Sequence, residues 1–316
     1  MVDSRRNGRN NQGTQEDKTM FTSMEYLHNN HRSFKQGALQ NLRHQTSLGA
    51  LYCMTHSKKV LVFSIALEGF EHTFSDCIRS HMQYCKKNGY KYLLIKKSPY
   101  RLQPHEAAWL KVPLMLASLS AGSEWCFFLD ADCEVRPHAP DFTTYLDKIA
   151  PEHSIFMAPG FSGRINSGVI FGKNEANTLE FLSTILAHAD SEVPDPEDVA
   201  PYENGHFIFW GKKNPSLYLL EHSLWNNNSN IDPDSYIQHY SRGKIRDLYL
   251  ESQASRKNNL ERLLESVSTL FYSTKRMEKR PLMTETDVII SESMQQLLAF
   301  YVKEYPDCFA NISERM

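Results

Sequence analysis

The 316-residue sequence has no long apolar segment. Its longest apolar runs, at residues 60–67 and 125–129, fall far short of the roughly 20 residues that a membrane-spanning helix needs. The N-terminus is rich in Arg, Asn and Gly and lacks the apolar centre of a signal peptide. We therefore expect a soluble, cytoplasmic protein, for which peripheral contact with a membrane surface stays open.

Net charge and cysteine content are also low. The formal net charge is -2 and the pI is near 6.7, so electrostatics give no argument for nucleic-acid binding. The 6 cysteines include no Cys-any-any-Cys pair and are too sparse for a disulfide scaffold, which predicts free thiols in a reducing compartment. Hydrophobic residues make up 41% of the chain, enough to build one large core.

Three segments of the chain differ in their pattern. Residues 1–57 are mostly polar with scattered apolar residues, which predicts a flexible N-terminal segment with a peripheral helix. Residues 58–250 alternate short apolar runs with amphipathic stretches, which predicts an α/β domain with a mixed, mainly parallel sheet flanked by helices. Residues 251–316 show helical periodicity and are expected to form a helical C-terminal appendage.

The first part of the α/β segment has the pattern of a β-α-β unit. Strands are expected at residues 58–67 and 90–95, with a helix at residues 74–88 between them. A crossover of this length predicts a parallel, right-handed unit. The first strand ends in the small residues Ser64 and Ala66, which would let a nucleotide base and ribose approach the backbone.

The most informative stretch is the apolar run Trp125-Cys126-Phe127-Phe128-Leu129, followed by Asp130-Ala131-Asp132. It predicts a buried parallel strand that presents two carboxylates at its carboxyl end, where ligand sites of open α/β sheets gather. Two carboxylates suit Mg²⁺ or Mn²⁺, and such an ion can hold the phosphates of a nucleotide. On this motif alone, a structural role in capping the next turn stays open.

Four further features each have a plain structural interpretation when taken singly. Lys111, in a helix expected at residues 105–119, could be a solvated side chain, and His239 could be a hydrogen-bonded core histidine. Asn166-Ser167-Gly168 could form a turn before a strand, and Glu203-Asn204-Gly205 could form a helix cap or a hairpin.

In their common order, however, the motifs resemble retaining GT-A nucleotide-sugar glycosyltransferases, especially family 34 and more distantly family 8. The resemblance covers about residues 58–249 and implies the GT-A (Rossmann-like) fold. Two departures stand out: Glu203-Asn204 replaces the usual Asp-Gln pair, and Gly243 lies one residue further from the preceding histidine than in family 8. The matching segments are Trp109-Leu110-Lys111, Asp130-Ala131-Asp132, Asn166-Ser167-Gly168, Glu203-Asn204 and His239-Tyr240-Ser241-Arg242-Gly243-Lys244.

The resemblance also implies roles for single residues. Asp130, Asp132 and His239 would bind Mn²⁺ or Mg²⁺, and Asn204 would lie near the reacting carbon. Glu203 and Lys111 would complete the catalytic set, with Lys244 or Arg246 adding positive charge at the leaving diphosphate. The nucleotide-sugar donor would be contacted by Ser64, Ala66, Lys111, Asp130, Ala131, Asp132, Asn166, Ser167, Gly168, Gly243 and Lys244.

The function that the resemblance implies is metal-dependent transfer of a sugar from a UDP-sugar to a hydroxyl acceptor, with retention of configuration. The acceptor would be a glycan, a lipid-linked molecule or a protein, as in polysaccharide or glycan biosynthesis, and no nucleic acid is involved. Two alternatives stay open: an inverting enzyme with Glu203 as base, and a non-catalytic GT-A-like carbohydrate-binding protein. A HAD-type phosphatase is disfavoured because Glu134 stands where that motif has Thr or Val.

Overall fold

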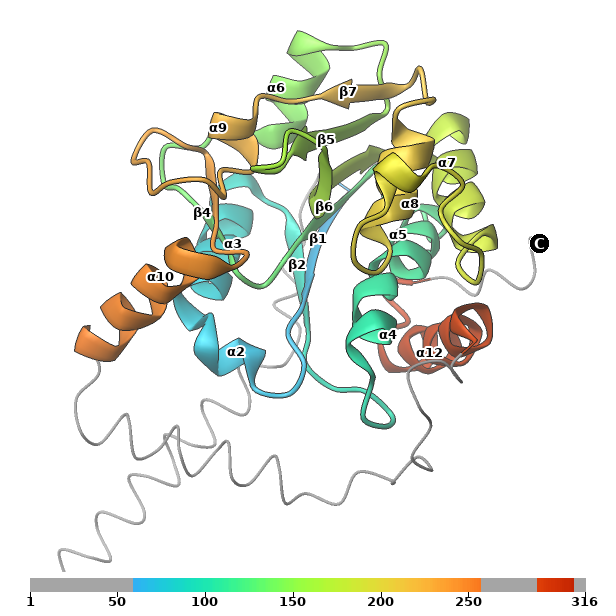
Figure 1. Ribbon diagram of the computed structural model, residues 1–316, viewed down its shortest axis with the longest axis horizontal. Coiled ribbons are helices and arrows are strands. Elements are labelled where there is room, and N and C mark those ends of the chain that lie inside the picture. Colours follow the sequence, from blue (N-terminus) through green and yellow to red (C-terminus); the bar gives the residue numbers. More distant parts are fainter. Residues whose placement is uncertain (1–58, 257–288, 310–316) are drawn as a thin grey trace, which may run out of the picture. The chain divides into compact units, whose positions relative to one another are not determined.

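The computed structural model of the protein describes residues 59–256 and 289–309 (Figure 1). All of these residues belong to one compact unit, Cys53–Met316. The helices expected within residues 20–51 and around residues 260–270 lie outside the described residues. Within the described ranges, we find no helix with the length and apolar character that crossing a membrane requires.

A six-stranded sheet with the order β2-β1-β3-β6-β5-β7 forms the centre of the fold. Neighbours run parallel at β2-β1, β1-β3 and β5-β7, whereas β6 is antiparallel to both β3 and β5. This confirms the expected mixed, mainly parallel sheet. The strands are β1 (Val60–Ile65), β2 (Lys91–Ile95), β3 (Trp125–Leu129), β5 (Ile155–Pro159), β6 (Ile165–Lys173) and β7 (Leu217–Leu219).

The expected β-α-β unit is present at the start of the sheet. A short helix, α2 (Phe70–Thr73), precedes α3 (Ser75–Asn88), and the chain then enters β2 parallel to β1. Gly89 ends α3 with a φ of 72°, a left-handed conformation that glycine adopts without steric strain. Five side chains of α3 are buried, as expected for a helix that covers one face of the sheet.

The helix expected at residues 105–119 is divided into α4 (Pro104–Trp109) and α5 (Lys111–Ser120). Pro113 therefore lies in the first turn of α5, where a missing backbone N–H does not cost a helical hydrogen bond. Nine of the α5 residues are buried, and α5 packs against β3, α7 (Ala176–Ala187) and α12 (Ile290–Glu304). Lys111 thus starts a buried helix and is not a solvated side chain.

A second, two-stranded sheet lies beside the main one and is formed by β4 (Cys133–Val135) and β8 (Ile237–His239). The two strands are antiparallel, and Cys133 pairs directly with His239. This pairing brings a residue more than a hundred positions later in the chain next to the two carboxylates that follow β3. The remaining elements are α6 (Phe142–Ile149), η1 (Pro196–Asp198), α8 (Asn204–Gly211), α9 (His222–Trp225) and α10 (Gly243–Arg256).

Helix α12 shares the main hydrophobic core. Met294, Leu297 and Tyr301 are buried there, on the side of α4 and α5. Asp190 accepts the backbone N–H of Ile290 at 2.5 Å and so caps the start of the helix. Helix α10 runs through the boundary expected at residue 250, and the division of the chain at residues 57 and 250 stays a prediction.

The structural alternative for Asn166-Ser167-Gly168, a turn before a strand, does not hold, because these residues lie inside strand β6. The pairing of β6 with β5 is irregular there: Ile170 pairs with Met157, but the next pair joins Asn166 to Ala158. Residues 167–169 of β6 therefore have no partner in β5. Such a β-bulge bends the strand and redirects its side chains. A bulged strand gives the same polar sequence signal as a turn, which is why the sequence leaves the turn open.

Candidate active site

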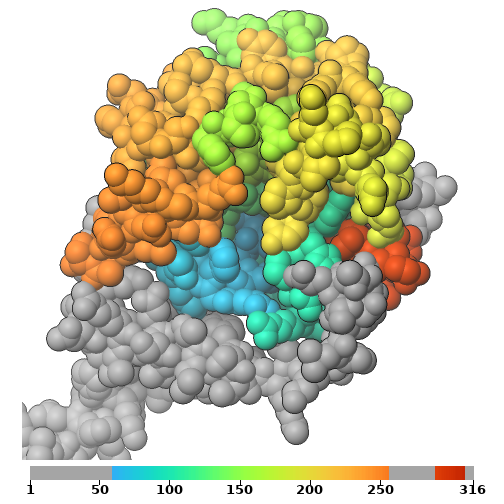
Figure 2. Space-filling view, viewed as in Figure 1, coloured from blue at the N-terminus to red at the C-terminus, as the bar shows by residue number. Residues whose placement is uncertain are grey.

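A cleft of about 1140 Å³ opens beyond the carboxyl ends of β1 and β3. It is the hollow near the centre of Figure 2, between the blue and teal segments and the green, yellow and orange ones. Its walls combine apolar side chains with a group of convergent charged ones, which is typical of small-molecule sites. Eleven residues that were assigned a role from the sequence line it: Lys111, Asp130, Ala131, Asp132, Asn166, Ser167, Gly168, Glu203, Asn204, His239 and Arg246.

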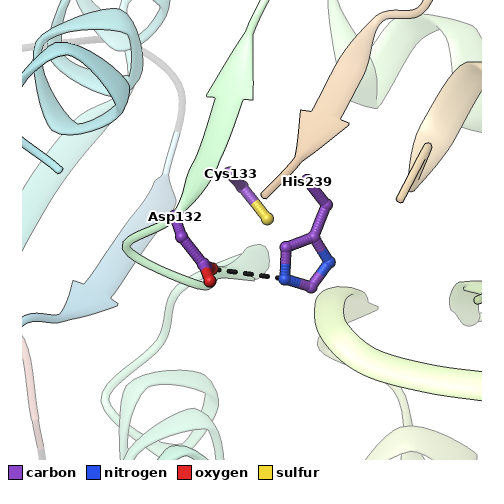
Figure 3. Close-up of side chains that lie close together, drawn as sticks. All are labelled: Asp132, Cys133 and His239. Atoms are coloured by element: carbon purple, nitrogen blue, oxygen red, sulfur yellow. Dashed lines mark ion pairs between the residues drawn. The ribbon is translucent and has the colours of Figure 1, made fainter. Parts of the chain in front are cut away.

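Two carboxylates and one imidazole nitrogen converge at the inner end of the cleft. His239 Nε2 lies 3.2 Å from Asp132 Oδ1 and 3.8 Å from Asp130 Oδ2, and Figure 3 shows the first of these carboxylates facing the ring. The second oxygen of each carboxylate faces a cation. Lys111 Nζ is 3.7 Å from Asp130 Oδ1, and Arg246 Nη2 is 2.5 Å from Asp132 Oδ2.

Backbone hydrogen bonds hold this arrangement in place. Asp130 donates its N–H to the carbonyl oxygen of Gly168 at 2.8 Å, and Asp132 accepts the N–H of Tyr240 at 2.9 Å. Gly168 leaves room for the site, because a Cβ there would lie 2.4 Å from His239 Cε1 and 2.8 Å from Asp130 Oδ2. Both distances are closer than carbon and oxygen atoms approach in proteins, so this position admits only glycine.

The orientation of His239 is set by Asn226, a residue that sequence reasoning missed. The fully buried Asn226 accepts a hydrogen bond at Oδ1 from Nδ1–H of His239 at 2.7 Å. Its Nδ2 donates to Asn166 Oδ1 at 2.9 Å. With the proton on Nδ1, Nε2 of neutral His239 carries a lone pair toward the carboxylates, as a metal-binding imidazole requires. No local pattern singles out Asn226 within its run of three asparagines.

The two carboxylates differ in their pKa. Burial raises the pKa of Asp130 to about 6, although Lys111 opposes the shift. Burial acts in the same direction on Asp132, but there the charges and hydrogen bonds of His239 and Arg246 prevail and lower its pKa to about 2. Burial also disfavours a charged His239, yet Asp132 outweighs it and raises the pKa of the imidazole. Asp132 is therefore the more firmly ionised of the two acids.

Lys111 joins Glu203 in a buried ion pair. The order of motifs assigns both residues to the site but does not predict that they pair. Lys111 Nζ lies 2.8 Å from Glu203 Oε1, and Ser167 Oγ donates to the same oxygen at 2.6 Å. Burial disfavours the charge of Lys111, but Asp130 and Glu203 outweigh it and raise its pKa. Glu203 is 3% exposed, and its Oε2 accepts no hydrogen bond from any described residue. That oxygen is a free acceptor in the wall of the cleft.

Glu203 and Asn204 lie at the start of helix α8, where Glu203 is the N-cap residue. Asn204 Oδ1 accepts the N–H of Ser167 at 2.8 Å, and its Nδ2 donates to the carbonyl oxygen of Ile165 at 3.3 Å. The two residues therefore attach α8 to the irregular part of β6. This contact joins two of the sequence motifs, Glu203-Asn204 and Asn166-Ser167-Gly168, in one wall of the cleft.

Four residues expected at the donor site do not line the cleft. Ser64 and Ala66 are fully buried, and Ser64 Oγ hydrogen-bonds His81 Nδ1 behind the sheet at 3.1 Å. Gly243 and Lys244 are exposed at the start of α10. Arg246, one turn further along, points back to the carboxylates instead.

Cys133 is a neighbour of the site that the sequence did not single out. Its Sγ, one Asp132 oxygen and one His239 nitrogen lie within 4.8 Å of one another. Figure 3 shows the three side chains side by side. Burial and the adjacent carboxylates raise the pKa of Cys133 well above the ordinary value, so the thiol keeps its proton. It donates that proton to the carbonyl oxygen of Gly168 at 3.8 Å.

Comparison with known proteins gives one sequence match and several structural ones. Residues 55–136 match the model of the galactosyl transferase GMA12/MNN10 family. Among the curated proteins, no sequence matches the chain. The matched segment runs from before β1 through the Asp130 and Asp132 motif to the end of β4.

Several solved glycosyltransferases are similar to this chain in structure. One involved in glycosylation of the major capsid of PBCV-1 is 17% identical, with a TM-score of 0.50 over 61% of this chain and 98% of that one. GlyE of Streptococcus pneumoniae is 14% identical, with a TM-score of 0.42 over 72% of this chain and 66% of that one. The galactosyltransferase LgtC, solved with donor and acceptor sugar analogues, is 11% identical, with a TM-score of 0.42 over 65% and 99%.

The TM-score of 0.50 with the capsid glycosyltransferase supports a shared fold, and the superposition covers 98% of that enzyme. The family match independently covers the segment that carries the paired carboxylates. On both grounds, the chain has a fold of the GT-A glycosyltransferase type, and its residues 55–136 match the sequence pattern of the galactosyl transferase GMA12/MNN10 family.

Proposed function

We propose that the protein is a metal-dependent glycosyltransferase that moves a sugar from a nucleotide-sugar donor, a UDP-sugar, to a glycan or other hydroxyl acceptor. The observation that carries this proposal is the convergence of Asp130 Oδ2, Asp132 Oδ1 and His239 Nε2 at the inner end of the cleft. A divalent cation bound by these three residues would stabilise the negative charge that develops on the departing diphosphate.

The donor atoms fit Mn²⁺ or Mg²⁺ better than Zn²⁺. Each carboxylate turns one oxygen toward His239 and the other toward a cation, so two oxygens and one nitrogen remain for a metal. Cys133 could add a sulfur ligand only as a thiolate, and its raised pKa disfavours that form. Oxygen ligands with a single imidazole suit hard divalent ions, and Mn²⁺ accepts nitrogen more readily than Mg²⁺ does.

We propose that two cations of the chain, Arg246 and Lys111, act on the diphosphate. Arg246 lies beside Asp132, and its guanidinium could donate paired hydrogen bonds to phosphate oxygens. Lys111 lies between Asp130 and Glu203, so it would neutralise charge near the phosphate and sugar. We propose these two side chains, together with the metal ligands, as the charge-stabilising part of the catalytic site.

The sugar of the donor would lie against Glu203. Its Oε1 is occupied by Lys111 and Ser167, whereas its buried Oε2 is free to accept a hydrogen bond from a sugar hydroxyl. Asn166 would add a second hydrogen bond, and Asn204, fixed to β6 through its amide, would lie near the reacting carbon. In the retaining reaction that we propose, the acceptor hydroxyl approaches the face that the diphosphate leaves, so no separate strong base is needed.

A binding and hydrolysis screen tests the proposal. Purified protein would be incubated with UDP-, GDP- and dTDP-sugars with and without Mn²⁺, and thermal stability and free nucleotide diphosphate would be measured. A ligand that binds only the folded state raises the Tm by mass action. We expect Mn²⁺-dependent stabilisation by UDP-sugars and slow release of UDP. No response to any nucleotide in the presence of metal would favour the carbohydrate-binding alternative.

The variant Asp132→Ala tests the metal site itself. We expect it to fold, because alanine is smaller than aspartate and adds no clash, but to lose Mn²⁺-dependent stabilisation and turnover. Arg79→Gln, which removes an exposed arginine of α3 paired with Asp76, is the control and should behave as wild type. An Asp132→Ala enzyme with normal metal-dependent turnover would disprove the assignment. NMR detection of the anomer formed in the first turnover would separate retention from inversion.

A further inference from the structure

One wall of the cleft carries a solvent-exposed aromatic ring and two arginines that the proposed donor site does not use. The turn at residues 160–164 joins β5 to β6 and is closed by a hydrogen bond from Gly160 N–H to the carbonyl oxygen of Arg164 at 2.8 Å. Phe161 lies in this turn, is 53% exposed and lines the cleft. Arg164 and Arg242 line the cleft as well.

The turn is held firmly from two sides. On one side, Asn228 Oδ1 accepts the N–H of Phe161 at 2.7 Å, and Asn228 Nδ2 donates to Ser241 Oγ at 3.2 Å. On the other side, Arg164 Nη1 donates to the carbonyl oxygens of Glu197 at 2.8 Å and of Val199 at 3.1 Å. The Phe161 ring is therefore presented by a fixed segment and not by a loose loop tip.

Neither Arg164 nor Arg242 pairs with a carboxylate of the described residues. Arg242 packs its guanidinium over Phe161, with Cζ 4.7 Å from the ring centroid, and Arg164 bonds only backbone carbonyls. Among the described residues, no carboxylate lies within ion-pair distance of either one. By contrast, every carboxylate that lines the cleft has a cation beside it: Glu68 has Arg101, Asp130 and Glu203 share Lys111, and Asp132 has Arg246.

We propose that Phe161, Arg164 and Arg242 form an acceptor subsite for a sugar that carries an anionic group, a carboxylate or a phosphate. An aromatic face packs well against the apolar face of a sugar ring, and a guanidinium fork matches both kinds of anion with paired, charge-assisted hydrogen bonds. The subsite deepens the proposed glycosyltransferase function and rests on it. It lies next to the donor position, since a Cβ placed on Gly160 of the same turn would lie only 3.3 Å from Asn166 Cβ.

Binding of simple sugars to protein preloaded with UDP and Mn²⁺ tests this inference, because UDP then fills the position of the donor diphosphate. The probes are methyl β-D-glucuronide for the carboxylate, glucose 6-phosphate for the phosphate and methyl β-D-glucoside as the neutral analogue. Ligand-observed NMR would give each Kd. We expect at least one anionic sugar to bind about tenfold more tightly than the glucoside, a difference of about 1.4 kcal/mol in binding free energy.

Variants separate the charge from the ring. Arg242→Gln and Arg164→Gln should each weaken binding of the anionic sugar about tenfold and leave the neutral sugar unchanged. Phe161→Ala should weaken both kinds of sugar to a similar extent, because it removes the stacking surface. Arg242→Lys keeps the charge but loses the fork, so an intermediate effect is expected. Arg79→Gln, outside the cleft, is the matched control and should change nothing.

The outcomes distinguish this inference from the function on which it rests. Equal affinity for charged and neutral sugars, or displacement of the anionic sugar by UDP, would overturn the subsite while leaving UDP binding intact. Failure of UDP to bind with Mn²⁺, together with selective binding of an anionic sugar that depends on Arg242, would overturn the proposed donor and support the subsite. A preference for the glucuronide or the phosphate would name the anionic group.

Discussion

Asn226 Oδ1 lies 2.7 Å from His239 Nδ1, in the interior of the protein behind the proposed metal site. The contact fixes which imidazole nitrogen carries the proton, and so which one faces Asp132 and Asp130. Through Nδ2, the same amide also binds Asn166, a residue proposed to contact the donor sugar. One buried side chain thus connects the metal-binding part of the site to the sugar-binding part.

Loss of this contact should weaken metal binding. We expect Asn226→Leu to lower the affinity for Mn²⁺ by about 10- to 100-fold, the usual effect of removing a hydrogen bond to a metal-binding histidine. Asn226→Asp keeps an oxygen that accepts from Nδ1–H, and should retain most of the affinity. Titration with Mn²⁺ monitored by electron paramagnetic resonance would measure both. Wild-type affinity in Asn226→Leu would show that the amide does not orient His239.

Gly168 should be irreplaceable for a steric reason. A Cβ at this position would lie 2.4 Å from His239 Cε1 and 2.8 Å from Asp130 Oδ2, so Gly168→Ala must displace both proposed metal ligands. We expect loss of Mn²⁺ binding and of turnover, with a fall of about 1–3 kcal/mol in the free energy of unfolding.

Gly172→Ala is the control for strand β6. Its Cβ would meet Thr178 Cγ2 at 3.0 Å, away from the site, so it should lower stability without changing the affinity for Mn²⁺. If Gly168→Ala lowers stability but binds Mn²⁺ like the control, the carboxylate and imidazole do not form the metal site.

The order of motifs was sufficient to predict that Lys111, Asp132 and His239 meet in one cleft, while their roles stay a prediction. These three residues are far apart in the chain. Lys111 begins α5, Asp132 lies just after β3, and His239 ends β8, which pairs with the strand that follows Asp132. The antiparallel direction of β6 was not predicted in the same way. A buried strand has the same continuous apolar pattern in either direction.

The errors at the site concern which way a side chain points. Ser64 and Ala66 have the small size expected near a nucleotide, but the side chain of Ser64 bonds His81 behind the sheet. Asn226 was missed for a related reason: its role depends on meeting His239 Nδ1 in three dimensions, and a run of asparagines predicts only a turn. Local pattern fixes the element, whereas the partners of a polar side chain depend on tertiary packing.

The ion pair between Lys111 and Glu203 should behave differently in stability and in catalysis. Both side chains are nearly fully buried with 2.8 Å between Nζ and Oε1, so Lys111→Met leaves a buried carboxylate without its cation. We expect a loss of about 3–5 kcal/mol in the free energy of unfolding for the single variant. The double variant Lys111→Met, Glu203→Gln should recover part of that loss but remain inactive. Urea unfolding measures the stability of each variant, and UDP release measures its catalysis. If the losses of stability in the two single variants simply add in the double variant, the two side chains do not form the pair.

The pH dependence of stability should report on His81, a fully buried histidine of α3. Its ring donates through Nε2 to the carbonyl oxygen of Cys133 at 2.6 Å and lies 3.1 Å from Ser64 Oγ through Nδ1. Burial lowers its pKa from the ordinary value to about 4. Between about pH 6.5 and pH 4 the unfolded chain therefore binds a proton that the folded protein does not.

Stability should consequently fall as the pH decreases through that window, by roughly 3 kcal/mol from this group alone. The variant His81→Gln cannot take up the proton, so its free energy of unfolding should vary less between pH 6.5 and pH 4, by about the same amount. Urea unfolding of both proteins at several pH values measures the difference, in which contributions from the other histidines and the carboxylates cancel. Parallel pH profiles for the two proteins would contradict this prediction, because they would mean that His81 binds a proton as readily in the folded protein as in the unfolded chain. The hydrogen bond to the Cys133 carbonyl and the complete burial of the ring argue against that outcome.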